Sequence, residues 1–314
     1  MEKMKVIFDT DIGDDIDDAL ALALVLELPQ IELLGVTTVF LNTDERARIA
    51  RKMLKLWGRD VPVYAGIRNG EGMNHNIHNR CCQYTPDLED PQYAPVNDVF
   101  TDEGRGAVDF ILENARKYGE ELTLITVGPL SNAAAAIKAD PEAMKKVRIV
   151  LMGGCFYRQF SEWNIVCDPR AAKAVINADN RVTCVGLEVT EKTILTDAQQ
   201  AAIMAPGKDE KMEYLAQLVR MHHGHTGRNA CLHDVLTVYY AVYPQILTTE
   251  DLLIRVETEG EFTAGMTVNM DEMFCYLSQP LPGTRTTVGK TVDAEAFLND
   301  LFKILYDGKD AVSE

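Results

Sequence analysis

The chain has 314 residues, 46% of them hydrophobic, and a formal net charge of -17 at pH 7. This length and apolar content can fill the core of one large α/β domain or of two ordinary ones. The acidic balance argues against a nucleic-acid partner, because a phosphate backbone is bound by clustered lysine and arginine side chains. A hard cation is a better match for so many carboxylates.

Neither a membrane segment nor a disulfide framework is expected. No stretch approaches the roughly 20 consecutive apolar residues of a membrane span, and the first residues reach aspartates before a signal-peptide core could form. The seven cysteines are odd in number and scattered, with no CxxC pair, so we expect reduced structural thiols. These features predict a cytoplasmic protein that does not bind a membrane.

Apolar runs of strand length alternate with helical patterns along almost the whole chain, which predicts βαβ units and a mostly parallel sheet flanked by helices. In chain order, strands are expected at residues 5–8, 31–39, 61–66, 122–128, 148–154 and 182–190. Helices are expected at residues 19–28, 43–57, 107–118, 131–140, 168–178, 232–243 and 292–306, with a mostly helical stretch at 196–223.

Two further stretches have a different character. Residues 68–102 are rich in Asn, Gly, Pro and Tyr and are long for a connection inside a compact domain, so we expect an active-site lid there. Residues 252–287 contain short segments separated by glycines, which indicates a small C-terminal β-hairpin region. Because no repeat or linker interrupts the pattern, a single domain over residues 1–314 with an open sheet is predicted.

Six aspartates crowd into ten positions, 9 to 18, immediately after the first expected strand. Ligands bind at the carboxyl ends of strands in open parallel sheets, so the position favours a site. A purely structural explanation, one helix cap and two acids in the first turn, accounts for Asp15, Asp17 and Asp18 only. Like charges this close raise one another's pKa unless a positive charge lies among them. With no Lys or Arg in the run, we expect a bound divalent ion, calcium rather than magnesium.

This run and four later segments resemble the inosine-uridine preferring nucleoside hydrolase family. The N-terminal motif of that family is an apolar strand followed by D-x-D-P-G-x-D-D, which is matched here by Asp9, Asp11, Gly13, Asp17 and Asp18. The segments VTTVFLN, TVGPLSN, LMGG with EWN and DP, and LHDVLTVYYAVY follow in the same order. Here Ile12 replaces the motif's proline, and two extra residues lengthen the turn before the paired aspartates. The resemblance covers residues 5 to about 243 and implies a nucleoside hydrolase-like, Rossmann-related fold.

The resemblance implies calcium-dependent hydrolysis of the N-glycosidic bond of ribonucleosides, or of a related N-ribosyl compound, to ribose and free base. The calcium ligands would be Asp11, Asp18, Asp234 and the carbonyl of Val127. Asp11 would also take the proton of the attacking water as general base. His233 would protonate the departing base, although a lone histidine at a helix start is often only a cap or a packed polar residue.

Sugar recognition and assembly are also implied by the resemblance. The residues that match the family's hydroxyl ligands are Asp17, Asn42, Glu162 and Asn164. Family members are often dimers or tetramers, so a homo-oligomer that takes a small nucleoside substrate, in purine or pyrimidine salvage, is expected. Four aromatic residues lie in or near the EWN segment, namely Phe156, Tyr157, Phe160 and Trp163. They would either stack on the base or lie in the core. We expect the histidines of RMHHGHTGR to lie at a solvated helix end.

Two alternatives remain at this point. The run VIFDTD also fits a haloacid-dehalogenase-like, magnesium-dependent phosphohydrolase with Asp9 as nucleophile and Asp11 as acid. Against it, Ile12 and Gly13 follow where that family has Thr or Val, and its distant lysine cannot be placed. A non-catalytic, calcium-dependent ribose or nucleoside binder would keep the ligands and lose turnover.

Overall fold

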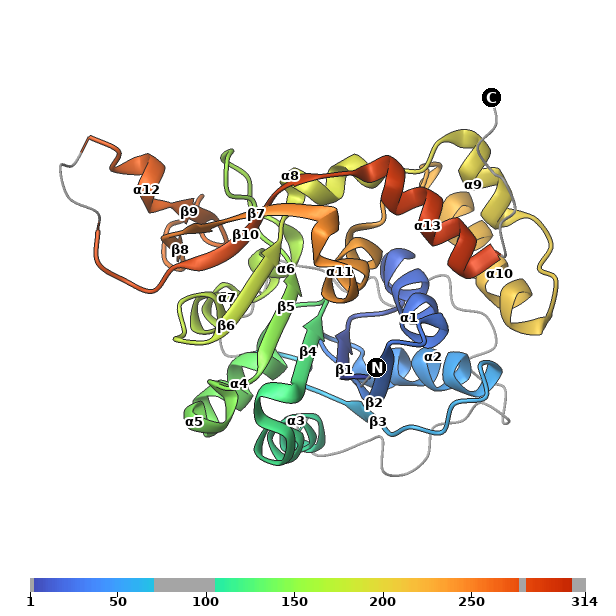
Figure 1. Cartoon of the computed structure of the whole chain (residues 1–314), viewed down its shortest axis with the longest axis horizontal. Coiled ribbons are helices and arrows are strands. Elements are labelled where there is room, and N and C mark those ends of the chain that lie inside the picture. Colours follow the sequence, from blue (N-terminus) through green and yellow to red (C-terminus); the bar gives the residue numbers. More distant parts are fainter. Residues whose placement is uncertain (1–2, 71–104, 277–280, 307–314) are drawn as a thin grey trace.

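The computed structural model describes residues 3–70, 105–276 and 281–306, and its central feature is one eight-stranded sheet (Figure 1). The strand order is β3-β2-β1-β4-β5-β6-β10-β7. The strands are β1 (Met4–Thr10), β2 (Ile31–Thr38), β3 (Val63–Ala65), β4 (Leu122–Thr126), β5 (Arg148–Met152), β6 (Arg181–Val185), β7 (Leu247–Leu252) and β10 (Thr286–Val292). All neighbours pair in parallel except β10 and β7, which are antiparallel. The expectation of an open, mostly parallel sheet is confirmed.

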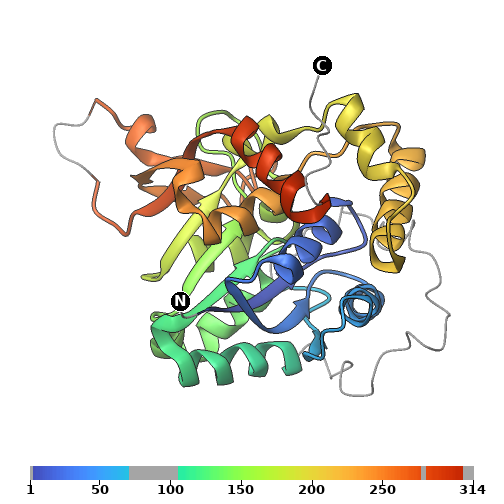
Figure 2. The ribbon, with the colours of Figure 1, turned by 45° about the vertical axis from the view of Figure 1, so that its right-hand side comes forward.

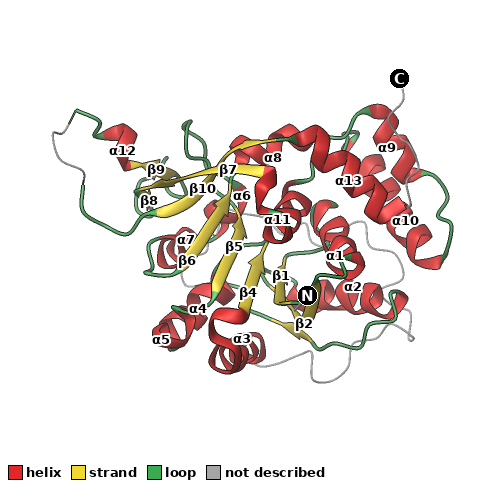
Figure 3. Ribbon diagram, in the orientation of Figure 1, coloured by secondary structure: helices red, strands yellow, loops and turns green. Residues whose placement is uncertain are grey.

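Helices cover both sides of this sheet, and Figure 3 shows the strands as a twisted layer between them. The helices are α1 (Asp17–Glu27), α2 (Thr43–Leu56), α3 (Arg105–Tyr118), α4 (Ser131–Ala139), α5 (Pro141–Met144), α6 (Trp163–Cys167), α7 (Pro169–Ile176), α8 (Leu187–Thr190), α9 (Asp197–Met204), α10 (Glu210–Thr226), α11 (His233–Val242), α12 (Met270–Met273) and α13 (Ala294–Tyr306). A two-stranded sheet of β8 (Ile254–Val256) and β9 (Thr267–Asn269) is the small hairpin region that the sequence predicts.

The sheet separates two hydrophobic cores. Val6 and Phe8 of β1 pack with α1, α2, α11 and α13, whereas Ile7 packs with α3, α4 and α7. This alternation follows from the two-residue period of a strand. Figures 1 and 2 show the two groups of helices on opposite sides of the sheet. The strands buried on both faces are therefore nearly continuous apolar runs, as parallel strands in α/β proteins are.

Helix α1 is buried along almost its whole length, which fixes the acidic turn before it. Its sequence DDALALALVLE contains the strong helix formers Ala and Leu, and residues Asp17 to Leu26 are all buried. A helix that is apolar on all sides belongs in the interior. Asp17 and Asp18 occupy its first turn, where the helix dipole favours negative charge. The purely structural explanation of the acidic run required Asp15 to cap this helix, but Ile16 is the N-cap residue and makes no side-chain capping bond.

Two stretches differ from the sequence expectations. The strand expected at 182–190 ends at Val185, because the Gly186 carbonyl accepts bonds from the amides of Val189 and Thr190 and so begins the α8 turn. Residues 286–292, of which the first two were expected in the hairpin region and the last in a helix, form β10 of the main sheet, which pairs in parallel with β6. Most of the expected lid, and His75 and His78 within it, lies outside the described residues.

Strands from both ends of the described chain join the same sheet, and the single domain over residues 1–314 stays a prediction. None of the helices in the described part of the chain combines the length and the apolar character needed to cross a bilayer.

Asp9 joins several elements at the centre of the sheet. Its fully buried carboxylate accepts hydrogen bonds from Thr37 Oγ1 of β2 (2.5 Å), Thr126 Oγ1 of β4 (3.2 Å) and Asn132 Nδ2 of α4 (2.8 Å). Burial raises the pKa of Asp9 to about 6, and the three hydrogen bonds oppose that rise. A carboxylate so enclosed holds the strands and α4 in place.

Replacing Asp9 with alanine is expected to lower the free energy of unfolding by about 3 kcal/mol or more, because buried donors lose a charged acceptor. Asp9→Asn keeps one acceptor oxygen and should fall between that variant and the parent. Urea unfolding followed by circular dichroism measures the loss. The control Asp179→Ala removes only an exposed ion pair with Lys145 and should leave the midpoint unchanged. An Asp9→Ala midpoint equal to that of the parent would contradict this role.

Candidate active site

A cavity of about 550 Å³ lies at the carboxyl ends of the central strands. Asp11 follows β1, Val127 follows β4 and Met152 ends β5, and all three line the cavity. Its acidic lining consists of Asp11, Asp14, Asp15, Asp17, Asp18, Glu162, Glu191 and Asp234. The position agrees with the rule that parallel sheets bind ligands at this edge. A larger cavity of about 640 Å³, bordered by α4 and α7, contains none of the predicted site residues.

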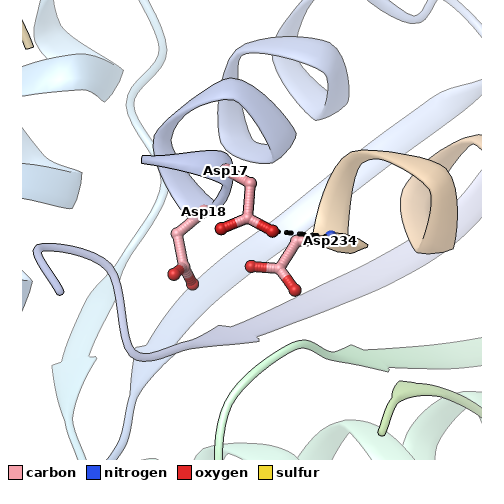
Figure 4. A group of neighbouring side chains, drawn as sticks. All are labelled: Asp17, Asp18 and Asp234. Carbon is pink, nitrogen blue, oxygen red and sulfur yellow. Dashed lines mark hydrogen bonds between the residues drawn. The ribbon is translucent and has the colours of Figure 1, made fainter. Parts of the chain in front are cut away.

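Three buried carboxylates converge in this cavity (Figure 4). Asp17 and Asp18 come from the first turn of α1, and Asp234 comes from the first turn of α11. One carboxylate oxygen of each residue lies within 4.8 Å of those of the other two. Asp17 Oδ2 also accepts a hydrogen bond from the Asp234 amide at 3.1 Å. Residues that are 217 positions apart in the sequence thus share one site.

The charges of this cluster oppose one another. Burial raises the pKa of Asp17, of Asp18 and of Asp234 well above the usual aspartate value, and repulsion from neighbouring aspartates of the cavity raises each pKa further. Three buried carboxylates this close together are destabilising for the folded protein if their charges are not compensated. The same set of oxygen ligands is suitable for a hard divalent ion. The donor set therefore fits calcium.

Asp11 lines the same cavity but lies outside the group of three carboxylates. Burial raises the pKa of Asp11 to about 7, and the Arg46 guanidinium lowers it. The sequence places Asp11 among the metal ligands and Asp17 among the sugar ligands, whereas the structure brings Asp17 into the tightest group. Both assignments remain predictions, because a ligand set of more than three oxygens has room for both.

The Val127 carbonyl and the Asn164 side chain are in direct contact. Asn164 Nδ2 donates to the Val127 carbonyl oxygen at 2.8 Å and to that of Met152 at 3.3 Å. A carbonyl oxygen has two lone pairs, so that of Val127 can still contact a second partner. Val127 and Asn164 both line the cavity, as the sequence predicts.

Glu162 caps helix α6 from inside the cavity wall. Its carboxylate accepts hydrogen bonds from the amides of Asn164 (2.9 Å), Ile165 (3.2 Å) and Gly154 (3.2 Å). Burial raises the pKa of Glu162 to about 7, and these hydrogen bonds oppose the rise. The capping bonds fix the carboxylate in place at the cavity, where a substrate hydroxyl could also reach it.

Asn42 is not among the residues that line the cavity. It precedes α2, and its side-chain amide donates to Glu45 Oε2 at 2.8 Å. The structure thus gives Asn42 a local partner and does not bring it together with the other predicted sugar ligands.

His233 begins α11 and faces the cavity next to Asp234. Its Nδ1 lies 2.8 Å from Thr190 Oγ1, which orients the ring. Burial lowers the pKa of His233, so the neutral imidazole is favoured. The Thr190 contact was not expected, because α8 was expected to be part of a strand.

The end of α10 forms another wall of the cavity, where the sequence favoured a solvated helix end. His222 is buried, and its Nε2 lies 3.1 Å from Asp15 Oδ1, while His225 lines the cavity one helical turn later. The expectation of a solvated helix end is therefore wrong for His222. The signal was present, since residues at i and i+3 share a helix face. Arg228 also lines this wall.

The four aromatic residues divide between core and cavity. Phe156 is buried in the core, and the Tyr157 hydroxyl donates to Glu250. Phe160 and Trp163 line the cavity and are 51% and 44% exposed. Of the four aromatic residues, only Phe160 and Trp163 can therefore stack on a planar ligand in the cavity.

Known proteins share both this sequence pattern and this fold. The inosine-uridine preferring nucleoside hydrolase family matches residues 6–299. The chain is 32% identical over 315 residues to the pyrimidine-specific ribonucleoside hydrolase RihA of Klebsiella pneumoniae, covering 94% of this chain and 96% of that protein. A solved plant nucleoside hydrolase, the PpNRh1 enzyme, is similar with a TM-score of 0.82 at 26% identity, covering 96% of this chain and 98% of that one. The purine-preferring ribonucleoside hydrolase from Gardnerella vaginalis has a TM-score of 0.80 at 28% identity, with the same coverage.

These matches extend over nearly the whole chain and leave no support for the phosphohydrolase alternative. The structure agrees, because the proposed nucleophile of that alternative, Asp9, does not line the cavity and is enclosed by Thr37, Thr126 and Asn132. The chain belongs to the inosine-uridine preferring nucleoside hydrolase family and is an N-glycosyl hydrolase that acts on ribonucleosides.

Proposed function

We propose that this protein hydrolyses the N-glycosidic bond of ribonucleosides in a calcium-dependent reaction that yields ribose and free base. The observation that carries the proposal is the convergence of Asp17, Asp18 and Asp234 in a cavity at the strand ends. Carboxylates held this close and this deeply buried need a cation for charge balance. Calcium accepts 6 to 8 oxygen ligands in flexible geometry, which suits a crowded set of acids.

The residues that would hold calcium are Asp11, Asp18, Asp234 and the carbonyl of Val127, with Asp17 either in the ligand set or at the sugar hydroxyls. When bound, the ion would supply activation of a water molecule and an anchor for the sugar hydroxyls. The remaining steps belong to the side chains of this chain.

Asp11 is proposed as the general base that accepts the proton of the attacking water. Its buried carboxylate borders the cavity that would contain the attacking water. As the glycosidic bond breaks, positive charge develops on the sugar. The surrounding carboxylates would stabilise that charge because they are fixed in a site with little water.

Sugar recognition is assigned to Asp17, Glu162 and Asn164, which the structure brings to the cavity, and to Asn42, which stays a prediction from the sequence. Phe160 and Trp163 present exposed rings for stacking with the base. The named relatives include a pyrimidine-specific and a purine-preferring enzyme, so a panel with both kinds of base is the appropriate substrate test.

His233 is proposed to help the departing base. Because Nδ1 lies against the Thr190 hydroxyl, Nε2 is the ring nitrogen left to exchange a proton with the leaving group. Burial favours the neutral ring, so His233 would first take up a proton from water in the cavity and then give it from Nε2 to the departing base, which returns the ring to its neutral form.

We also propose a cytoplasmic homo-oligomer that functions in nucleoside salvage. Among the described residues, Cys155, Cys167, Cys184, Cys231 and Cys275 are free thiols, which supports a reducing compartment. The oligomeric state rests on the family resemblance, and light scattering coupled to gel filtration would measure it.

Asp11→Asn is expected to lower kcat on the best nucleoside of the panel by about 100- to 10,000-fold, because the amide cannot accept the proton of the water. A reducing-sugar assay for free ribose gives kcat and KM. The matched control is Asp209→Asn, which keeps a good N-cap residue for α10 far from the chemistry. Full activity of Asp11→Asn would contradict the proposed base. Saturable nucleoside binding with no ribose release from the parent protein would instead favour the non-catalytic binder.

Removal of calcium with a strong chelator is expected to abolish ribose release, and added Ca²⁺ should restore it. Calorimetric titration of the chelator-treated protein should show one high-affinity site. Asp18→Asn and Asp234→Asn should each weaken binding, because each removes a charged ligand. Asp197→Asn, at the first turn of α9, serves as a control for general loss of charge. Undiminished turnover of the chelator-treated enzyme would refute calcium dependence.

His233→Ala is expected to reduce turnover of inosine by about 100-fold, the low end of general acid contributions. Ribosides with activated leaving groups, such as p-nitrophenyl riboside, should lose much less because their leaving group departs without a proton. The control His223→Ala removes a histidine of α10 that contacts the Arg228 carbonyl. If inosine and the nitrophenyl substrate lost activity to the same extent, the leaving-group role would be wrong.

A further inference from the structure

One buried arginine lies behind the acidic cavity, and the proposed function does not yet use it. Arg46, on α2, has 0% of its surface exposed and is the largest fully buried side chain among the described residues. A guanidinium remains charged at all physiological pH values, so its complete burial needs compensation by hydrogen bonds or opposite charges.

The guanidinium contacts two loops, of which the one that follows β1 lines the cavity. Nε donates to the Phe40 carbonyl at 2.9 Å, and Nη1 donates to the Ile12 carbonyl at 3.2 Å. Ile12 directly follows Asp11, whereas Phe40 lies two residues before Asn42. Arg46 thus links the turn after β1 to the turn after β2.

Both turns need such support. The first lacks the proline that would fix its backbone and is two residues longer than the family motif. Its Ile12 peptide is held from both sides, since the amide donates to Thr10 Oγ1 at 3.0 Å and the carbonyl accepts from Arg46. In the second turn, Phe40 and Leu41 have φ values of 73° and 56°, in the left-handed region that non-glycine residues rarely adopt.

The charge of Arg46 also acts on the site. It attracts the carboxylates of Asp11 and Asp18 and so favours their ionised forms. A positive charge at this place has opposite effects on a bound cation, because it repels the cation directly while holding the acidic turn in the shape that receives it. The net effect on cation affinity therefore distinguishes a positioning role from a purely electrostatic one.

We propose that Arg46 is a positioning residue of the active site: its guanidinium ties the Asp11 turn to the Asn42 turn and so presents the carboxylates in the geometry that binds calcium. This inference rests on the proposed calcium-dependent hydrolysis. Arg46 touches neither substrate nor reacting atoms and acts through the backbone carbonyls of Ile12 and Phe40.

The test compares Arg46→Met, Arg46→Lys and a matched control, Arg51→Met. Arg51 lies on the same helix, and its Nη1 donates to the Val61 carbonyl at 2.9 Å, away from the cavity. Each variant is first checked for cooperative thermal unfolding. Calcium affinity is then measured by calorimetry on chelator-treated protein, and kcat and KM are measured separately at saturating Ca²⁺.

Arg46→Met is expected to weaken calcium binding by about 10- to 100-fold, as loss of a residue that orients metal ligands does. At saturating Ca²⁺, kcat should fall by more than KM rises, because the misplaced acids act in the chemical step. Arg46→Lys keeps the charge and one donor, so it should recover part of the loss. Arg51→Met should match the parent in calcium affinity, kcat and KM.

Calcium binding by Arg46→Met that equals or exceeds that of the parent would overturn the proposal, since charge removal alone strengthens cation binding. An equal loss in Arg51→Met would overturn it too, by revealing a general effect of α2. If Arg46→Met does not fold, Arg46→Lys decides by the same criteria. If the parent protein binds calcium but releases no ribose, the proposed hydrolysis is wrong. The calcium affinities of the variants would still test the positioning role of Arg46. A parent that binds no calcium would overturn both.

Discussion

Repulsion between buried carboxylates is the constraint on which the rest of the site depends. Asp17, Asp18 and Asp234 are brought together by two helices that are themselves firmly packed, so the acids cannot separate to relieve it. Helix α1 is enclosed on all sides, and its dipole offsets only part of the negative charge. The proposed cation would offset this repulsion in a way that no rearrangement of the side chains could.

The surrounding structure is arranged to keep these acids in place. Asp9 ties β1 to its neighbours immediately before the turn, Thr10 Oγ1 donates to Asp18, and the Asp234 amide donates to Asp17. Arg46 holds the turn from the opposite side. Few of these contacts involve groups that would touch a substrate. Most of the precision of the site is therefore supplied by residues that take no part in the reaction.

Local periodicity was enough to predict the sheet, because its strands are apolar runs and its helices have clear patterns. Strand β10 was the exception: its sequence TTVGKTV has few buried apolar side chains, and it belongs to the main sheet only because β6 and β7 are there to pair with it. Short helix α8 was missed because the turn at Gly186 depends on backbone hydrogen bonds that residue types do not reveal.

The acidic part of the site could be predicted from the spacing of the aspartates, but its partners could not. Asp234 was linked to the N-terminal turn through the family resemblance alone. In the charged sequence of α2, Arg46 has no feature that separates it from its solvent-facing neighbours, and its burial is decided by where the preceding loop passes. The contact of Asn42 with Glu45 and the burial of His222 beside Asp15 were not foreseen for a related reason, because Glu45 and Asp15 were not distinguishable from other nearby acids.

The hydrogen bond between the Asp234 amide and Asp17 also has a consequence for biosynthesis. Because the ribosome delivers the first turn of α1 long before it delivers α11, the early half of the chain must exist for a time with its acids unmatched by their distant partner. During that interval, the emerging polypeptide lacks one of the three carboxylates of the proposed cation site. The proposed site is therefore incomplete until α11 has been made, and a product truncated before α11 would contain the acidic turn without Asp234.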